Sequence, residues 1–298
     1  MKWILTMLLA SSMVLVAADN TPKAGKARKG KGGKPKKILV VTVTKGFRHS
    51  SIPTAEKVIG ELAADSKAFQ VDYARVEPTD PQFKGPDGKP DKEKVDEAIR
   101  KVLAEKMNGE ALGKLDGIIF ANTTGDLPLP DKEAFLEWIK SGKSFVGMHA
   151  ATDTFHNYEP YIDMIGGSFK THGPQVEVEA LNKDKECPAC RQLGESLKMF
   201  EEIYLFSNFD PSKVRTVLAL DKHPNAGTPG DFPLSWCRYY GKGRVFYTAL
   251  GHREDIWDAN TPENYQRKNS PEVSRAFQAH ILGGIKWTLG LEQWDIKP

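Results

Sequence analysis

Three short apolar segments of this chain are each followed, within a few residues, by a histidine. Each segment is rich in Val, Ile, Phe or Tyr and gives way to Gly, Ser, Ala or Asp, as a buried parallel strand does when it ends in a loop. Ligands of open α/β sheets bind beyond the carboxyl ends of the strands. The pattern therefore predicts a polar site, suited to a metal ion, at one edge of a parallel sheet. The segments and their histidines are Lys37–Lys45 with His49, Ser144–Met148 with His149, and Arg244–Leu250 with His252.

The N-terminal residues have the pattern of a secretory signal peptide. Lys2 supplies a positive start, an apolar run follows, and Val16-Ala17-Ala18 offers small residues for cleavage. Residues 1–18 are therefore predicted to be a signal peptide, with an uncleaved N-terminal anchor as the alternative. The run is too short and too early to be a usual spanning helix. We expect an exported protein, periplasmic or secreted, without a transmembrane segment after cleavage.

Residues 19–36 are basic and contain little that a fold would bury. Their Lys, Arg, Gly, Pro and Ala content predicts a disordered linker. The first 37 residues carry a net charge of +8, which leaves −5 on the remainder of a chain whose total is +3. A mildly acidic folded part argues against nucleic-acid binding. The basic segment is able to touch anionic polymers or lipid, although a solvated linker is the simpler interpretation.

Residues 37–298 are long enough for a single α/β domain with a large core. Their first half alternates strand and helix patterns, which predicts right-handed crossovers and a doubly wound, mostly parallel sheet flanked by helices. The less regular second half is expected to add antiparallel strands and to end in a hairpin and a long helix. The predicted strands are 38–44, 69–76, 115–121, 144–148, 176–181, 214–220, 234–239 and 244–250, and the helices run from Ser50 or Ser51 to about Ala64 and over 91–107, 131–141 and 271–288.

The segment Gly147-Met148-His149-Ala150-Ala151 lies where the fourth strand turns toward the next helix. Small residues around one polar side chain are what a nucleophile elbow needs, because the tight turn leaves no room for bulk. Ser or Cys usually stands at the centre, so a histidine there argues against thiol-dependent amide hydrolysis. His149 is predicted to be a general base or a metal ligand. Asp153 either accepts the imidazole N–H and fixes the tautomer, or caps the next helix.

Further polar residues follow the other strands at the same edge. Arg48 and His49 occupy a tight turn before a helix N-terminus, which favours an anionic or oxygen-rich ligand. Asp126 follows the third strand, while Glu202 and His172 either reach the site or lie at sheet edges. The predicted catalytic residues are His49, His149, Asp153 and His252; the predicted substrate contacts are Arg48, Asp126 and Glu202; the predicted ligands of a divalent metal such as zinc are His49, His149, His172 and His252.

Two tryptophans near the last strands are candidates for sugar binding. Aromatic faces stack on the apolar C–H surface of sugar rings, and Trp236 and Trp257 are predicted to do so. The alternative is ordinary core packing, which is the commoner fate of tryptophan. His280, inside the last predicted helix, is expected to be structural.

The three cysteines suggest no clear chemistry. Cys187 and Cys190 form a Cys-Pro-Ala-Cys motif after a charged stretch, which predicts a surface loop, and Cys237 stands alone. A disulfide across the pair is compatible with export, but a redox role needs the motif at a helix N-terminus in a thioredoxin-like unit. A zinc ribbon would need a second cysteine pair. The sequence leaves the disulfide open.

Several segments together resemble the ThuA-like, or trehalose-utilisation, family over roughly residues 37–291. The resemblance implies a class I glutamine-amidotransferase-like (flavodoxin-like) fold in which histidine replaces the cysteine of the elbow. It also implies a link to carbohydrate metabolism through disaccharides and keto-sugars. The Cys-Pro-Ala-Cys motif is not part of this family pattern. The matching segments are Gly46–Ser50, Phe145–Thr154, Glu202–Tyr204, Pro233–Trp236 and Tyr240–His252.

The residues and the resemblance together predict an exported enzyme whose ligand is a small carbohydrate. It would act on a disaccharide or keto-sugar derivative by hydrolysis, elimination or isomerisation, using the strand-end histidines. The alternative is a non-catalytic sugar-binding protein that keeps the pocket. A cysteine-dependent amidotransferase is disfavoured, because the isolated Cys237 lies in a strand-like segment. The sequence does not indicate an oligomeric state.

Overall fold

The computed structural model describes residues 34–261 and 265–296, and the described residues from Pro35 onward form one compact unit. The predicted signal peptide, 1–18, and residues 19–33 of the predicted linker lie outside the described residues. The first strand begins at Lys36, the last residue of that predicted linker. Within the described part of the chain, no helix is long and apolar enough to cross a membrane.

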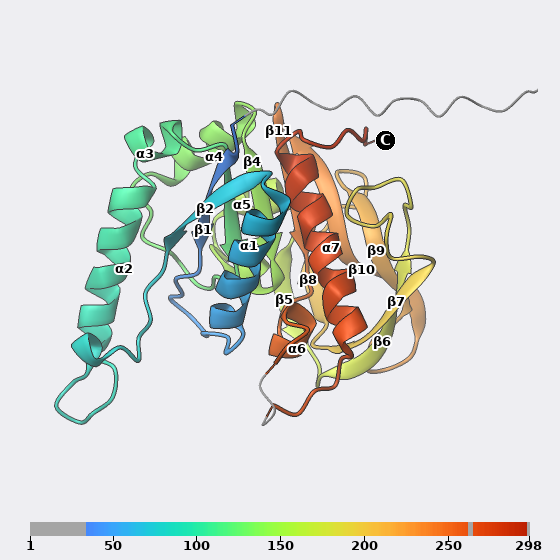
Figure 1. Cartoon of the computed structure of the whole chain (residues 1–298), viewed down its shortest axis with the longest axis horizontal. Coiled ribbons are helices and arrows are strands. Elements are labelled where there is room, and N and C mark those ends of the chain that lie inside the picture. The colour runs from blue at the N-terminus through green and yellow to red at the C-terminus, as the bar shows by residue number, and fades with distance from the viewer. Residues whose placement is uncertain (1–33, 262–264, 297–298) are drawn as a thin grey trace, which may run out of the picture. The chain divides into compact units, whose positions relative to one another are not determined.

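A nine-stranded sheet organises the described residues (Figure 1). Its order is β2-β1-β3-β4-β11-β10-β9-β6-β7. The pairs from β2 to β11 are parallel and those from β11 to β7 antiparallel, which confirms the predicted α/β sheet with antiparallel additions. The strands are β1 (Lys36–Val41), β2 (Phe69–Ala74), β3 (Gly117–Ala121), β4 (Ser144–Met148), β5 (Ser168–His172), β6 (Val176–Asn182), β7 (Ser196–Glu201), β8 (Tyr204–Ser207), β9 (Arg215–Lys222), β10 (Pro229–Tyr240) and β11 (Gly243–Thr248).

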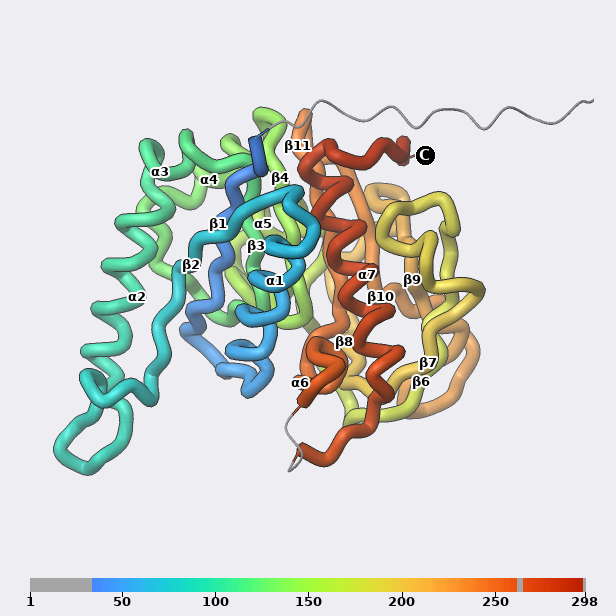
Figure 2. Tube along the Cα trace, in the orientation of Figure 1, coloured from blue at the N-terminus to red at the C-terminus, as the bar shows by residue number. Residues whose placement is uncertain are grey.

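Helices cover both faces of this sheet, as a buried parallel sheet requires. Along β1, Ile38 and Val40 pack in one core layer with α1 and α7, whereas Leu39 and Val41 pack in the other with α2, α4 and α5. Figure 2 shows α1 and α7 side by side on one face. The helices are α1 (Ile52–Ser66), α2 (Lys92–Lys106), α3 (Gly109–Gly113), α4 (Lys132–Lys140), α5 (Glu159–Ile165), α6 (Glu254–Trp257) and α7 (Pro271–Thr288).

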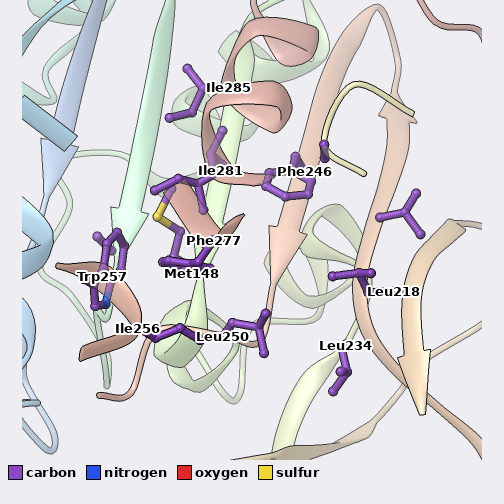
Figure 3. Packing of buried hydrophobic residues seen from close by; sticks show 14 of the residues in the cluster. Met148, Leu218, Leu234, Phe246, Leu250, Ile256, Trp257, Phe277, Ile281 and Ile285 are labelled. Carbon is purple, nitrogen blue, oxygen red and sulfur yellow. The ribbon is translucent and has the colours of Figure 1, made fainter. Parts of the chain in front are cut away.

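The carboxyl ends of the two central strands are anchored in the core. Figure 3 shows Met148, the last residue of β4, and Leu250, just after β11, among buried side chains that include Phe277 of α7. Both residues are fully buried. Tight packing of this kind fixes the backbone that follows. The histidines next in the chain, His149 and His252, therefore start from a rigid frame.

The second half contains the predicted hairpin and an additional small sheet. β10 and β11 pair with Tyr240 opposite Gly243, and Gly241 in the turn has a φ of +60°, which glycine adopts without steric cost. β6 and β9 confirm the predicted antiparallel strands. The short strands β5, mostly exposed, and β8, mostly half-buried, form a two-stranded sheet with His172 opposite Tyr204. That pairing brings His172 toward Glu202, which lies just before β8.

His280 is the structural histidine that the sequence predicts. It is fully buried in α7; its Nδ1 lies 2.8 Å from the Ala189 carbonyl oxygen, and its Nε2 lies 3.2 Å from the hydroxyls of Ser235 and Thr248. Burial lowers the pKa of His280 to about 4. Between about pH 6.5 and pH 4, His280 is therefore protonated in the unfolded chain and neutral in the folded chain.

We expect this proton to destabilise the fold in acid. Because the folded pKa lies below the unfolded value, the stabilisation is complete above about pH 6.5 and is lost as pH falls toward 4, by about 3 kcal/mol. In the variant His280→Gln, the free energy of unfolding should fall less steeply between pH 7 and pH 4.5 than in the wild type. Urea denaturation in the presence of a chelator measures both slopes. Equal slopes would refute the assignment.

Candidate active site

His149 occupies a strained turn directly after β4. It opens a 3-10 turn, His149–Asp153, and its φ of +46° is uncommon for any residue with a side chain. A Cβ atom at Gly147 would lie 2.9 Å from the Ile165 Cδ1 atom and 3.2 Å from the Ala151 Cβ atom. The small residues around His149 are thus needed for the close approach of neighbouring elements. This is the elbow geometry that the sequence predicts.

A backbone carbonyl, rather than Asp153, orients the His149 ring. The His149 Nδ1 lies 2.8 Å from the carbonyl oxygen of Ala249; because a carbonyl only accepts, Nδ1 donates and Nε2 keeps its lone pair. The carboxylate of Asp153 instead contacts His156. Asp153 does not cap the following helix either, since the N-cap of α5 is Tyr158. Both roles predicted for Asp153 are therefore wrong in this structure.

Four side chains from separate segments converge beyond the carboxyl ends of the central strands. One ligand atom from each lies within 4.8 Å of those of the others. The Nε2 atoms of His49 and His149 are 3.2 Å apart, and Glu202 Oε2 lies 3.7 Å from His149 Nε2 and 3.1 Å from His252 Nδ1. We call His49, His149, His252 and Glu202 the strand-end cluster. The first strand, β4 and β11 supply the histidines, and the β7–β8 connection supplies Glu202.

The backbone around His252 is held by several hydrogen bonds. The Gly251 carbonyl accepts from Ser51 Oγ at 3.0 Å, Asn122 Nδ2 at 3.1 Å and Trp257 Nε1 at 2.8 Å. Gly251 has a φ of +128°, and a Cβ there would lie 3.1 Å from the Trp257 ring, so only glycine fits without strain. These contacts fix the position from which His252 reaches the cluster.

Glu201, which the predicted site residues do not include, links the backbone of Glu202 to that of Gly251, the residue before His252. Its Oε1 accepts from the Glu202 backbone N–H at 2.9 Å, and its Oε2 accepts from that of Gly251 at 3.2 Å. Glu201 is fully buried, and burial raises its pKa to about 7. A pair of adjacent carboxylates at a strand end was the sequence signal that could have identified it.

The electrostatics favour neutral imidazoles at His49 and His149. Burial lowers the pKa of His49 to about 4, helped by His252, and lowers that of His149 well below its usual value. Burial also acts to lower the pKa of His252, but Glu202 outweighs it and raises the pKa above the usual range. His49 and His149 therefore offer lone pairs at neutral pH without losing a proton.

Within the described residues the buried His252 Nδ1 makes no regular hydrogen bond, although it lies 3.1 Å from Glu202 Oε2; His49 Nδ1, the ring nitrogen that does not face His149, also makes none. Unsatisfied buried polar atoms are costly and point to a missing partner. Zinc bound at 2.0–2.1 Å by four ligands places neighbouring ligand atoms about 3.3 Å apart, close to the separations of 3.1, 3.2 and 3.7 Å in the cluster. Three imidazoles and a carboxylate are also a donor set suited to zinc.

His172 touches the cluster without joining it. Its Nδ1 lies 3.1 Å from Glu202 Oε1 and 2.9 Å from the Gly173 carbonyl oxygen, and its side chain is 42% exposed. The metal set predicted from the sequence contains His172, whereas the structure places Glu202 in that position. The pairing of β5 with β8 brings His172 and Glu202 close together. Glu202 rather than His172 then supplies the fourth ligand atom of the cluster.

Two other predicted substrate contacts point elsewhere. Arg48 pairs with Glu77 at 2.8 Å and lines a separate cavity of about 600 Å³ between α1, β2 and α2. Asp126 is mostly exposed and contacts Lys132. No described contact joins either side chain to the strand-end cluster. The structure does not support the predicted roles of Arg48 and Asp126 in substrate binding at this site.

The predicted sugar-stacking tryptophans are both fully buried. Trp236 Nε1 donates to the Ile165 carbonyl, and Trp257 Nε1 to the Gly251 carbonyl, so each ring packs in the core. An exposed aromatic residue does lie next to the cluster: the side chain of Phe47 is 67% exposed. Its ring lies edge-on to His49, with centroids 4.8 Å apart.

The cysteine motif is not on the surface. Cys187, Cys190 and Cys237 are all buried and carry free thiols. Asp184, at the start of this turn, accepts from the Cys187 backbone N–H and pairs with Arg215. The charged residues before the motif thus serve to hold a buried turn, and the predicted surface loop is wrong.

The comparisons with known proteins agree with this fold. The model of the ThuA family, described as trehalose utilisation, matches residues 37–288. A ThuA-like protein from Parabacteroides merdae is 17% identical, with a TM-score of 0.61 over 89% of this chain and 94% of that one. A ThuA-like protein from Bacteroides uniformis is also 17% identical, with a TM-score of 0.58 over 89% and 95%. No curated protein matches the sequence. The two structural likenesses establish the glutamine-amidotransferase-like fold.

Proposed function

Since the chain belongs to the ThuA, or trehalose-utilisation, family, we propose that it is a metal-dependent enzyme that acts on a carbohydrate. The observation that carries the proposal is the strand-end cluster, in which three histidines and Glu202 bring four potential ligand atoms within 4.8 Å of one another. Burying imidazoles and a carboxylate costs free energy unless they are paired or share a partner such as a metal ion. A binding role therefore explains their convergence better than packing does.

The cluster would hold one divalent ion, of which zinc fits the donor set best. When bound, the ion supplies a Lewis acid that polarises an oxygen of the substrate. His149 contributes Nε2 because the Ala249 carbonyl holds the proton on Nδ1. Glu201 accepts hydrogen bonds from the backbone N–H groups of Glu202 and Gly251. It thereby fixes the positions of Glu202 and His252, as outer hydrogen bonds do around metal ligands.

His172 is suited to moving a proton between substrate and solvent. Its Nδ1 faces two acceptors, the Gly173 carbonyl and Glu202, so this nitrogen donates and Nε2 is left to accept. The ring is partly exposed, so a proton on Nε2 can exchange with solvent. Hydrolysis, elimination and isomerisation of a sugar all need a base beside a polarised oxygen, and a disaccharide or keto-sugar derivative is the proposed substrate.

Phe47 is placed to contact the substrate at the entrance. Its exposed ring lies edge-on to His49, a buried histidine of the cluster. An exposed phenyl face suits the C–H surface of a sugar ring. We also propose export, on the basis of the signal-peptide pattern in residues 1–18.

Turnover assays with defined metal content test this proposal. Protein stripped with a chelator and then reloaded with zinc should turn over 3-keto-disaccharides, and the stripped protein should not. Equal turnover by stripped and reloaded protein would refute metal dependence. Zinc-loaded protein that binds the sugars and leaves them unchanged would favour the non-catalytic sugar-binding alternative.

A further inference from the structure

A groove of about 440 Å³ lies between the small β5–β8 sheet and the start of β10. Its size falls in the range of small-molecule binding sites, about 300–1,000 Å³. Four of its lining residues are aromatic, and none of them was predicted from the sequence as a site residue. They are Tyr204, Phe206, Phe209 and Phe232.

The aromatic floor of the groove rests on the core. Phe206 and Phe209 pack against the buried ring of Trp236, with centroids 5.1 and 5.0 Å away. Trp236 therefore supports this floor from beneath. Phe232 stands at the rim, partly exposed, with its ring edge-on to that of His223 at 5.4 Å.

Polar side chains border the same aromatic surface. Lys170, Asn208 and Asp231 line the groove and are exposed. None of the three forms an ion pair within the described residues, so their donors and acceptors face solvent. A carboxylate, an amide and an ammonium around aromatic rings can bind hydroxyl groups while the rings cover C–H faces. This combination suits a sugar ring better than an apolar ligand or a highly charged one.

The groove adjoins the strand-end cluster. Tyr204 lines the groove, and its ring lies against that of His149 with centroids 4.3 Å apart. Thr171, another lining residue, precedes His172, which contacts Glu202. A ligand in the groove would therefore contact Tyr204, whose ring packs against His149 of the strand-end cluster.

We propose that this groove is a saccharide subsite, which holds the second ring of a substrate whose first ring lies over the strand-end cluster. The inference rests on the proposed function, because it places a further part of the same carbohydrate substrate. Phe232 and Asp231 are then specificity-determining residues: they select disaccharides over monosaccharides. Phe232 covers one face of the second ring, and Asp231 accepts from its hydroxyls.

Calorimetric titration of the zinc-loaded protein with trehalose, maltose and glucose tests the subsite. We expect at least one of the disaccharides to bind more tightly than glucose in the wild type. Phe232→Ala and Asp231→Asn should each weaken binding of that disaccharide by about 3- to 10-fold, the loss of one stacking or hydrogen-bonding contact, with no change for glucose. Tyr239→Ala, which removes another exposed aromatic ring of β10, is the matched control and should change neither.

Failure of this inference can be told apart from failure of the proposed function. If the wild type prefers a disaccharide and both groove variants keep that preference, the subsite is wrong while the carbohydrate site at the cluster stands. If glucose and the disaccharides bind equally in the wild type, the groove holds no second ring. If none of the three sugars binds while the zinc-loaded protein turns over 3-keto-disaccharides, the subsite is wrong and the carbohydrate function stands; if neither binding nor turnover occurs, both are contradicted.

Discussion

Replacement of His149 by alanine should lower the zinc affinity more than about 100-fold and abolish turnover. Loss of an outer-shell partner already costs roughly 10- to 100-fold in metal affinity, and His149 is an inner ligand in our account. Its ring is fully buried, and its Nε2 faces His49 Nε2 at 3.2 Å.

Two controls separate ligand loss from damage to the turn. The buried His149 ring donates to the Ala249 carbonyl, so alanine leaves a cavity and an unpaired carbonyl, and the variant loses some stability as well. His49→Ala removes a ligand outside any such turn and should lose zinc to a similar extent. His280→Gln changes a buried histidine elsewhere and should retain zinc. Zinc binding that survives in both cluster variants, measured by calorimetry on folded protein, would contradict the assignment.

Glu202→Gln should have the second largest effect, with an affinity loss of about 100-fold and little or no turnover. The carboxylate lies within 3.7 Å of three histidines, namely His149, His172 and His252. Glutamine keeps the size of the side chain and the backbone N–H bond to Glu201, but it removes the negative charge. A neutral amide is a poorer zinc ligand and no longer orients His172 for proton transfer.

His172→Gln distinguishes the two roles of Glu202. In our account this variant retains zinc, because His172 lies outside the cluster, yet it loses most of its turnover. We therefore expect both the affinity for zinc and kcat to fall in Glu202→Gln. In His172→Gln, measured in the same way, kcat should fall while the affinity for zinc is unchanged. A Glu202→Gln protein that binds zinc as tightly as the wild type would remove the carboxylate from the ligand set.

The convergence of three histidines could be predicted because it depends on topology alone. Each follows a strand of the parallel part of the sheet, and the carboxyl ends of parallel strands share one edge. The small residues around His149 likewise predicted a tight turn, since Gly147 has no space for a side chain. The fold class and these parts of the site depend on short-range patterns that can be recognised in a single sequence.

The rest of the site depends on details that such patterns do not contain. Asp153 is four residues from His149, but the direction of the turn sends its side chain to His156. Trp236 and Trp257 lie near the site in sequence, yet side-chain packing buries both. Glu202 reaches the cluster because β7 and β8 place it there, and those strands are short or interrupted by polar residues.

The central claim is that His49, His149, His252 and Glu202 bind one divalent metal ion. Its most direct test is zinc titration of chelator-treated protein by calorimetry, with elemental analysis of the dialysed product. Our account predicts one zinc per chain in the wild type and none retained after dialysis of His149→Ala. A wild type that retains no zinc, or a His149→Ala protein that retains one equivalent, would contradict it.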